Sequence, residues 1–137
     1  VPLYGRIAAG DPISMPQADV PPESYIDIAR ELLRAPANKE LFALRVRGQS
    51  MIDALVDDGD IVVLAHQETA NNGDMVAAWI ESREEWTLKR FYQNSDRVTL
   101  RPANPMMFTE QDIQQKFTFP AEDVKISGKV CLVLRQI

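Results

Sequence analysis

Two residues of this chain, Ser50 and Lys89, could together break a peptide bond. A serine hydroxyl becomes a nucleophile when a nearby base removes its proton, and a lysine whose amine is neutral can serve as that base. The segment Ile7-Ala8-Ala9-Gly10 offers a matching substrate, because small residues on both sides of a bond let the backbone approach a crowded active site. If these three segments act together, Ser50 and Lys89 would cut the chain itself between Ala9 and Gly10.

The neighbourhood of Ser50 suits a nucleophile. A predicted strand, Leu41 to Arg47, is followed by Gly48, which permits a sharp bend, and we expect a short helical turn over Ser50 to Val56. At a strand-to-helix junction the backbone N–H groups are free and the helix dipole is positive, and both features stabilise the oxyanion of an attacked carbonyl. Taken alone, the pattern is more typical of a serine that caps a helix.

Lys89 can act as a base only if the protein keeps it away from water. A lysine with the ordinary pKa of about 10.4 is almost entirely charged at pH 7, whereas burial can lower that pKa by about 3 to 5 units. Lys89 lies in a predicted strand, Glu85 to Tyr92, where alternation places it on the same face as Thr87. If Ser50 is not considered, Lys89 is more typical of an exposed lysine on a strand, because lysines are rarely buried. The only histidine, His66, is the alternative base, but nothing in the sequence pairs it with Ser50.

The proposed substrate segment is loop-like. Ile7 could anchor it in an apolar slot, Gly10 tolerates a sharp turn, and Pro12 prevents the region from joining a helix. Attack within one chain also benefits from a high effective concentration, so modest catalysis would suffice. In isolation, Ala-Ala-Gly is only a loop tripeptide.

The rest of the chain predicts a mainly β domain. Six of the nine prolines lie in the first forty residues, so we expect a loop-rich N-terminal segment with at most a short helical turn near Ala29 to Arg34. From Leu41 onward, short alternating runs are separated by turn sequences such as Asp57-Asp58-Gly59-Asp60. The predicted strands are Leu41 to Arg47, Asp60 to Ala65, Met75 to Glu81, Glu85 to Tyr92, Arg97 to Arg101 and Lys125 to Arg135.

The last predicted strand alternates throughout its length. One face would carry Ile126, Gly128, Val130, Leu132 and Leu134, and the other Lys125, Ser127, Lys129, Cys131, Val133 and Arg135. Cys131 and Val133 lie among charges on the second face, which suits either an ordinary core strand or a partly buried surface that faces another subunit.

Composition excludes several classes of protein. The chain has 137 residues, 45% of them hydrophobic and 26% charged, which is typical of one globular domain, and its apolar runs are too short to span a bilayer. The single Cys131 cannot form an internal disulfide and no secretion signal is present, so we expect a cytoplasmic location. The net charge of −5 gives no overall attraction to nucleic acid, so any contact with DNA must come from elsewhere.

Taken together, the three segments resemble the C-terminal domain of the LexA family, within the serine-lysine peptidase group that also includes UmuD, CI-type phage repressors and, more remotely, bacterial signal peptidase. Residues 5–12 resemble the family's cleavage segment, and residues 44–51 its nucleophile segment. Asp58-Gly59-Asp60 resembles the turn that follows, and Thr87-Leu88-Lys89-Arg90 the strand of the lysine. The spacings agree as well, since the serine lies 40 residues after the cut site and the lysine 39 residues after the serine.

The resemblance implies a role for each matched residue. Ser50 would be the nucleophile, Lys89 the general base, the backbone N–H groups of Gln49 and Ser50 the oxyanion site, and Ala9–Gly10 the scissile bond, preceded by Ile7 and Ala8. It implies a compact β fold like that of LexA and signal peptidase, with no cofactor and no metal. Residues 1–16 would be the linker and cleavage segment, and residues 17–137 the domain that cleaves itself and dimerises.

The resemblance also implies partners. The domain would form a homodimer, partly through its C-terminal strand, and a filament of RecA on single-stranded DNA would stimulate its cleavage. Operator DNA would be bound only through an N-terminal domain that this chain lacks, and no membrane is involved. Cleavage would separate the two parts and lift repression of DNA-damage genes, which makes this chain the sensing and self-cleaving half of an SOS repressor.

Other readings use the same residues. A UmuD-like accessory protein of a translesion polymerase, or a CI-type phage repressor, would share Ser50 and Lys89, and a helix-turn-helix upstream in the full gene would identify a repressor. A signal-peptidase-like enzyme acting on other chains is disfavoured because a fitting substrate lies within this chain. In a non-catalytic dimerisation module, Ser50 and Lys89 would be incidental. The resemblance is weakest over Val20 to Lys39 and Asn104 to Gln115, where loop lengths vary.

Overall fold

Strands dominate the computed structural model, which describes residues 1–8, 22–33 and 38–137. Within these residues nine strands form a single sheet in the order β2-β1-β3-β4-β9-β5-β6-β7-β8. The strands are β1 (Pro2–Ala8), β2 (Ser24–Tyr25), β3 (Leu41–Arg47), β4 (Ile61–His66), β5 (Met75–Ile80), β6 (Glu85–Asn94), β7 (Arg97–Arg101), β8 (Thr118–Pro120) and β9 (Val124–Leu134). The prediction of a mainly β fold is confirmed.

One α-helix and four short 3₁₀ turns connect the strands of the described residues. They are α1 (Glu110–Lys116), η1 (Arg30–Leu32), η2 (Ile52–Ala54), η3 (Glu81–Arg83) and η4 (Ala121–Asp123). None of these helices, in the part of the chain that the structure describes, is long and apolar enough to cross a membrane.

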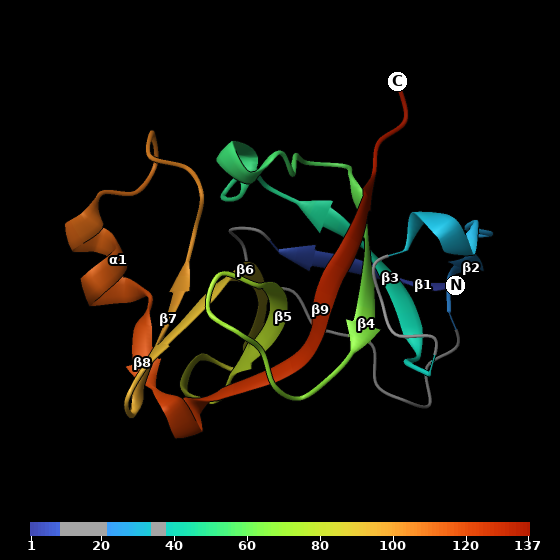
Figure 1. Ribbon diagram of the computed structural model, residues 1–137. Coiled ribbons are helices and arrows are strands. Elements are labelled where there is room, and N and C mark those ends of the chain that lie inside the picture. The colour runs from blue at the N-terminus through green and yellow to red at the C-terminus, as the bar shows by residue number, and fades with distance from the viewer. Residues whose placement is uncertain (9–21, 34–37) are drawn as a thin grey trace.

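The long strand β9 holds the two halves of the sheet together. It pairs antiparallel with β4 on one side and with β5 on the other. The half built from β4, β3, β1 and β2 therefore lies on one side of β9 and the half built from β5 to β8 on the other, with α1 beyond β7 (Figure 1). Close approach at this junction requires Gly128, because a Cβ added there would lie 2.9 Å from the carbonyl oxygen of Ala65 and 3.0 Å from the ring of Phe42.

All six predicted strands are present, and their ends differ from the prediction by at most two residues. Three strands and the α-helix were not assigned from the sequence: β1, β2, β8 and α1. The strand β1 lies in the proline-rich head, but its proline is the first residue of the strand, where a missing N–H is tolerated. The helix α1 begins with a capping box, in which Thr109 and Asp112 each accept a hydrogen bond from the other's backbone N–H.

The prediction of uninterrupted alternation along β9 was wrong. In the pairing with β4, Leu132 lies opposite Val63 and Val130 opposite Leu64, so Cys131 is an extra residue, that is, a β-bulge. A bulge reverses which face the following side chains occupy. Val130 therefore packs in one core cluster and Leu132 in another, although the sequence placed them on the same face. A second register shift lies at Ser127, in the pairing with β5.

Three apolar clusters form the core. The first surrounds Phe42, Leu44, Met51, Leu64 and Leu88, and it therefore joins β3 and β4 to the loop after β3 and to β6. The second cluster fills the space around Phe91, Leu100 and Phe119, and the third contains Leu3, Ala43 and Val63. Because Met51 and Leu88 are fully buried in the first cluster, the residues next to them, Ser50 and Lys89, are fixed relative to one another by core packing.

The glycine at the centre of the sheet gives a prediction about stability. Gly128→Ala should lower the free energy of unfolding by about 1 to 3 kcal/mol, because the new methyl group meets a backbone oxygen that cannot move aside. Urea unfolding followed by circular dichroism measures the change. The neighbouring Ser127→Ala substitution is the matched control, and equal midpoints for the two variants would contradict the close approach.

Candidate active site

Ser50 lies in the turn between β3 and η2 and is completely buried. Gly48 makes this turn with a φ of 93°, in the left-handed region that residues with a Cβ rarely adopt. The turn η2 begins after Met51, and no side chain caps it. Ser50 therefore does not serve as a helix cap, and the alternative explanation for the Gly-x-Ser pattern fails.

The turn at residues 57–60 is hydrogen-bonded to the loop that carries Ser50. The backbone N–H of Gly48 donates to Oδ1 of Asp58 over 2.8 Å. The side chain of Gln49 donates to Oδ1 of Asp57 over 3.1 Å. These bonds tie both residues that precede Ser50 to a second segment, so the loop does not rely on its own short sequence to keep its shape.

The turn at residues 57–60 is itself held by Arg135, near the C-terminus. Asp60 is buried, and its carboxylate accepts two hydrogen bonds of 2.8 Å from Arg135 and one of 2.8 Å from the backbone N–H of Asp57. The hydrogen bonds from Arg135 hold the pKa of Asp60 below its usual value. The carbonyl of Asp60 also accepts from the N–H of Val46, which fixes the end of β3.

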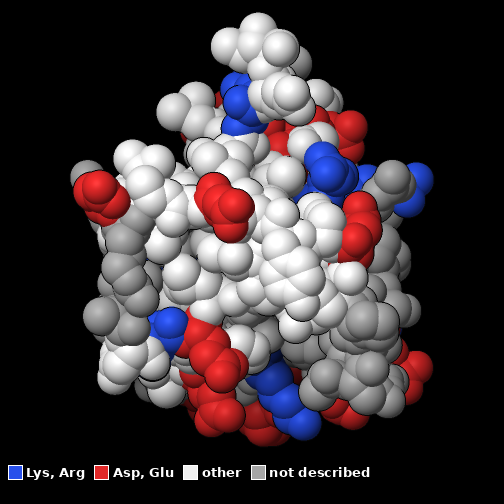
Figure 2. All heavy atoms as spheres, turned by 90° about the vertical axis from the view of Figure 1, so that its right-hand side faces the viewer, with Lys and Arg blue, Asp and Glu red and all other residues white. Residues whose placement is uncertain are grey.

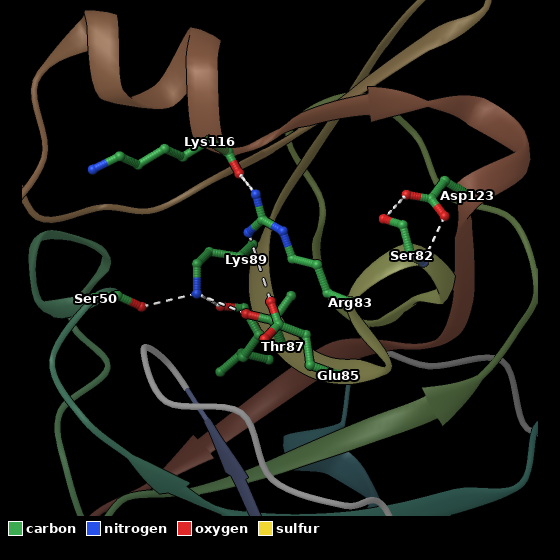
Figure 3. Close-up of polar contacts among 9 residues, drawn as sticks. Ser50, Ser82, Arg83, Glu85, Thr87, Lys89, Lys116 and Asp123 are labelled. Atoms are coloured by element: carbon green, nitrogen blue, oxygen red, sulfur yellow. Dashed lines mark hydrogen bonds and ion pairs between the residues drawn. The ribbon is translucent and has the colours of Figure 1, made fainter.

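Lys89 meets Ser50 inside the protein. It comes from β6, only 2% of it is exposed, and its Nζ lies 3.1 Å from Oγ of Ser50. Nζ also donates to Oγ1 of Thr87 over 2.7 Å and to the carbonyl of Leu88 over 3.2 Å. Figure 3 shows the amine between Ser50 on one side and Thr87 on the other. The structure thus brings together the two residues that the sequence analysis proposed as a pair.

Three oxygen neighbours can accommodate the amine of Lys89 in either protonation state. An uncharged lysine has two N–H donors and one lone pair, whereas the ammonium has three donors and no acceptor. As an ammonium, Nζ donates to all three oxygens, whereas the neutral amine can donate to Thr87 and Leu88 and direct its lone pair at the hydroxyl of Ser50. Burial lowers the pKa of Lys89 to about 7, and the negative charge of Glu85 opposes this only in part. A substantial fraction of the amine is therefore neutral at physiological pH.

The end of α1 covers Lys89. The ring of Phe117, the residue that ends the helix, lies 6.0 Å from Nζ. Arg83 holds this end in place, because its guanidinium donates to the backbone carbonyl of Lys116 (Figure 3). The same guanidinium lies over the ring of Phe119, 4.8 Å from its centroid. Sequence analysis did not find this cover, because α1 was not predicted.

His66 is not part of this site. It is the last residue of β4, it is exposed, and its ring packs against Phe42 with 4.8 Å between ring centroids. Among the described residues no hydrogen bond joins His66 to Ser50. The expectation that this histidine is solvated agrees with its exposure.

The segment proposed as substrate leads towards the site. Ile7 and Ala8 are the last two residues of β1, and their backbones pair in parallel with Val46 and Arg47 of β3. Ala9 and Gly10, the proposed scissile pair, lie outside the described residues. Since β1 and β3 run in the same direction, both strands end at the same edge of the sheet.

Backbone N–H groups are available next to Ser50. Those of Gln49 and Ser50 donate to no other residue that the structure describes. The carbonyl of Gln49 accepts from Nδ2 of Asn104 over 2.8 Å and from the N–H of Ile52 over 3.2 Å. We expected a helix dipole to contribute here, but η2 has only three residues, so its dipole is small. Sequence analysis also did not single out Asn104.

The chain is similar to known peptidases and repressors. Residues 2–131 match the protein family described as Peptidase S24-like. The LexA repressor of Herpetosiphon aurantiacus is 42% identical over 137 residues, which cover 100% of this chain and 61% of that protein. The LexA repressor of a Roseiflexus species is 44% identical over 138 residues, with 60% of that protein covered, and that of a Parafrankia species is 45% identical with 48% covered. The chain thus spans about half to three fifths of the length of these relatives.

The buried lysine should make stability depend on pH. Its pKa is about 7 in the folded protein and near 10.5 in the unfolded chain, so the unfolded chain binds more protons between these values. The free energy of unfolding should therefore rise with pH from about 7 to about 10.5. Lys89→Met should remove this rise and stabilise the protein at pH 7 by up to about 4 kcal/mol, since one pKa unit is worth about 1.36 kcal/mol.

Urea unfolding at pH 7, 8.5 and 10 measures this contribution. Lys125→Met is the control, because that side chain is 71% exposed and its loss should leave the slope of the parent unchanged. If Lys89→Met kept the parent's slope, the ammonium would not be excluded from the folded protein.

Proposed function

Because this chain belongs to the Peptidase S24-like family, we propose that it is the self-cleaving part of a LexA-type repressor, and that it breaks its own Ala9–Gly10 bond. The observation that carries the proposal is the buried contact between Ser50 and Lys89, with 3.1 Å between Oγ and Nζ and a lysine pKa of about 7. An exposed lysine would be charged and could not accept a proton.

The reaction uses the two side chains in turn. The neutral amine of Lys89 accepts the hydroxyl proton while Oγ of Ser50 attacks the carbonyl carbon of Ala9. The oxyanion that forms accepts hydrogen bonds from the N–H groups of Gln49 and Ser50. The ammonium of Lys89 then gives its proton to the nitrogen of Gly10, which leaves as an amine. Ala9 remains as an ester on Ser50 until water, deprotonated by Lys89, attacks the ester carbonyl. Lys89 then returns the proton to Oγ of Ser50, and the new carboxyl group of Ala9 is released.

Thr87 sets the direction of the lone pair. Its hydroxyl accepts a hydrogen bond of 2.7 Å from Nζ of Lys89, and the carbonyl of Leu88 accepts another of 3.2 Å. With both N–H bonds of the neutral amine directed at these acceptors, the lone pair is left for the third neighbour, Ser50. The base is therefore oriented before the substrate arrives, and orientation of this kind contributes to rate.

The parallel pairing of β1 with β3 supports the choice of bond. Ala8 pairs with Arg47, the scissile bond begins at the next residue, and Ser50 follows three residues after Arg47. The strands that precede the proposed scissile bond and Ser50 thus end at the same edge of the sheet. We propose the division suggested by the sequence, with residues 1–16 as linker and cleavage segment and residues 17–137 as the self-cleaving domain.

Control of transcription would involve more than this chain. The relatives are named repressors and are longer, and the net charge of −5 gives no electrostatic attraction to DNA. We propose that operator DNA is bound by a part of the protein outside this chain, and that a filament of RecA on single-stranded DNA stimulates the cut. Loss of the connection between the two parts would then end repression of DNA-damage genes.

The half-buried end of β9 supports a homodimer. Although β9 lies in the middle of the sheet, the residues 129–134 are all only partly buried, and Cys131, Leu132 and Leu134 pack at the margin of the third core cluster. Figure 2 shows a stretch of surface on the side of β1 to β3 with no charged side chains and with acidic and basic residues along its margins. Depletion of charged residues is typical of the central part of a protein–protein interface.

Self-association can be tested at the last residue of β9. Leu134→Glu should weaken the dimer at least tenfold, because the interface would have to bury a carboxylate. Sedimentation equilibrium measures the dissociation constant, with circular dichroism to verify that the variant is folded. Gln93→Glu, an exposed position on β6, is the control. A parent chain that stays monomeric, or a variant that dimerises equally well, would contradict this interface.

The proposed function predicts a cut at one bond. The purified chain, incubated between pH 6 and pH 9, should yield fragments ending at Ala9 and beginning at Gly10, identified by mass spectrometry. The rate should rise about tenfold from pH 6 to pH 8 and then level off, since the neutral fraction of Lys89 follows its pKa of about 7. Ser50→Ala and Lys89→Ala should each abolish the cut in a folded protein.

Two exposed residues provide matched controls for this experiment. Ser24→Ala and Lys125→Ala remove the same chemical groups at the surface and should leave the rate unchanged. Cleavage that survives Ser50→Ala or Lys89→Ala would remove that residue from the mechanism, and a cut at a different bond would move the substrate segment.

A further inference from the structure

We propose that Asn104 is a positioning residue for the cleavage reaction, because its side chain fixes the peptide group that carries the oxyanion donor of Ser50. This inference rests on the proposed function of Ser50. It adds a residue from the segment after β7, which the sequence analysis noted only as the start of a loop of variable length.

The side-chain amide of Asn104 is bonded at both ends. It is 7% exposed, and Nδ2 donates to the carbonyl of Gln49 over 2.8 Å. Oδ1 accepts from the N–H of Met106 over 3.2 Å. Rotating the amide by half a turn would place N–H against N–H and oxygen against oxygen, so only one orientation is compatible with these neighbours. The hydrogen bond from the N–H of Met106 to Oδ1 therefore keeps Nδ2 directed at the carbonyl of Gln49.

This bond determines the direction of a backbone N–H. The carbonyl of Gln49 and the N–H of Ser50 belong to one planar trans peptide group, in which they point in opposite directions. A side chain that holds the carbonyl therefore also orients the N–H. That N–H donates to no other residue in the described ranges, so it is available to a ligand.

The neighbouring residue secures the other side of Ser50. The N–H of Ala103 donates to the carbonyl of Ser50 over 2.6 Å, and the carbonyl of Ala103 accepts from the N–H of Asp53 over 2.7 Å. The segment 103–104 thus contacts the peptide groups before and after the nucleophile. Of these contacts, only the one made by the side chain of Asn104 depends on the type of residue at its position, because the others use backbone atoms.

Asparagine fits this position better than its closest relatives. Aspartate would have the same shape, and it could still accept from Met106, but it would place a negatively charged oxygen against the carbonyl of Gln49. It would also bring a negative charge near the oxyanion that forms during the reaction. Alanine would leave the carbonyl of Gln49 only its longer bond of 3.2 Å from Ile52.

The test compares self-cleavage of the parent chain with that of Asn104→Ala and Asn104→Asp. We expect the rate at the alkaline plateau to fall about tenfold to a hundredfold in the alanine variant and further in the aspartate variant, because loss of a direct oxyanion donor costs about 10² to 10³ in rate. In the alanine variant the pH at half-maximal rate should stay within about 0.3 units of the parent's, since Lys89 keeps its neighbours. A general loosening of the fold would instead admit water to Lys89 and move this pH.

A second readout measures the oxyanion site without turnover. A peptide boronic acid with alanine at its C-terminal position forms a tetrahedral adduct with a serine nucleophile, and one boronate oxygen occupies the place of the oxyanion. Its affinity should fall in parallel with the rate in both Asn104 variants. Circular dichroism and urea unfolding define the conditions under which each variant is folded, and the isosteric aspartate variant serves if the alanine variant does not fold.

Asn72→Ala is the matched control. The side chain of Asn72 also joins two backbone segments, since Oδ1 accepts from the N–H of Gln93 over 2.8 Å, but it lies in an exposed turn. This variant should cleave and bind the boronic acid like the parent. If the parent is cut and a folded Asn104 variant is cut at a rate within twofold of the parent's, the role of Asn104 is overturned but the proposed function is not. A parent chain that is never cut would overturn the proposed function and this inference with it.

Discussion

The arrangement of this domain depends on keeping the amine of Lys89 away from water. Lys89 is among the largest fully buried side chains, and burial is the first cause of its lowered pKa. Excluding a charge from water costs free energy, and the cost is a sizeable part of the total stability of an ordinary domain, about 5 to 15 kcal/mol. The surrounding core must therefore stabilise the fold and also outweigh the free-energy cost of burying Lys89, which is the cost that lowers its pKa.

The serine side of the site shows the complementary strategy. Here the backbone is held by polar contacts from three distant parts of the chain: the turn at residues 57–60, Arg135 near the C-terminus, and residues 103–104. Such contacts keep dipoles fixed before the reaction begins, so that little reorganisation is needed when charge develops. Apolar packing sets the protonation of Lys89, and polar contacts set the geometry around Ser50.

The sequence was a good guide wherever structure is local. Strands such as Leu41–Arg47 and Arg97–Arg101 were predicted to the residue, because alternation and turn residues are properties of neighbours along the chain. The pairing of Ser50 with Lys89 required the resemblance to a family, since nothing in either segment alone distinguishes a catalytic residue from a cap or a surface lysine. The helix α1 was missed although its signal, Thr109 followed by Asp112, is visible in the sequence. The bulge at Cys131 and the contact from Asn104 to Gln49 depend on cross-strand register and on residues 55 positions apart, so no local pattern reports them.

The parallel pairing of β1 with β3 bears on how long a cut molecule stays whole. Residues 1–8 lie between β2 and β3, Leu3 is buried in the third core cluster, and the carbonyls of Val1 and Leu3 accept hydrogen bonds from Ile26 and Glu23. Breaking the bond after Ala9 removes none of these contacts. The nicked chain would remain a non-covalent complex, like a domain complemented by its own detached strand, until that strand peels away. The lifetime of the complex, and not only the rate of the proposed cleavage, would then determine when the two fragments separate.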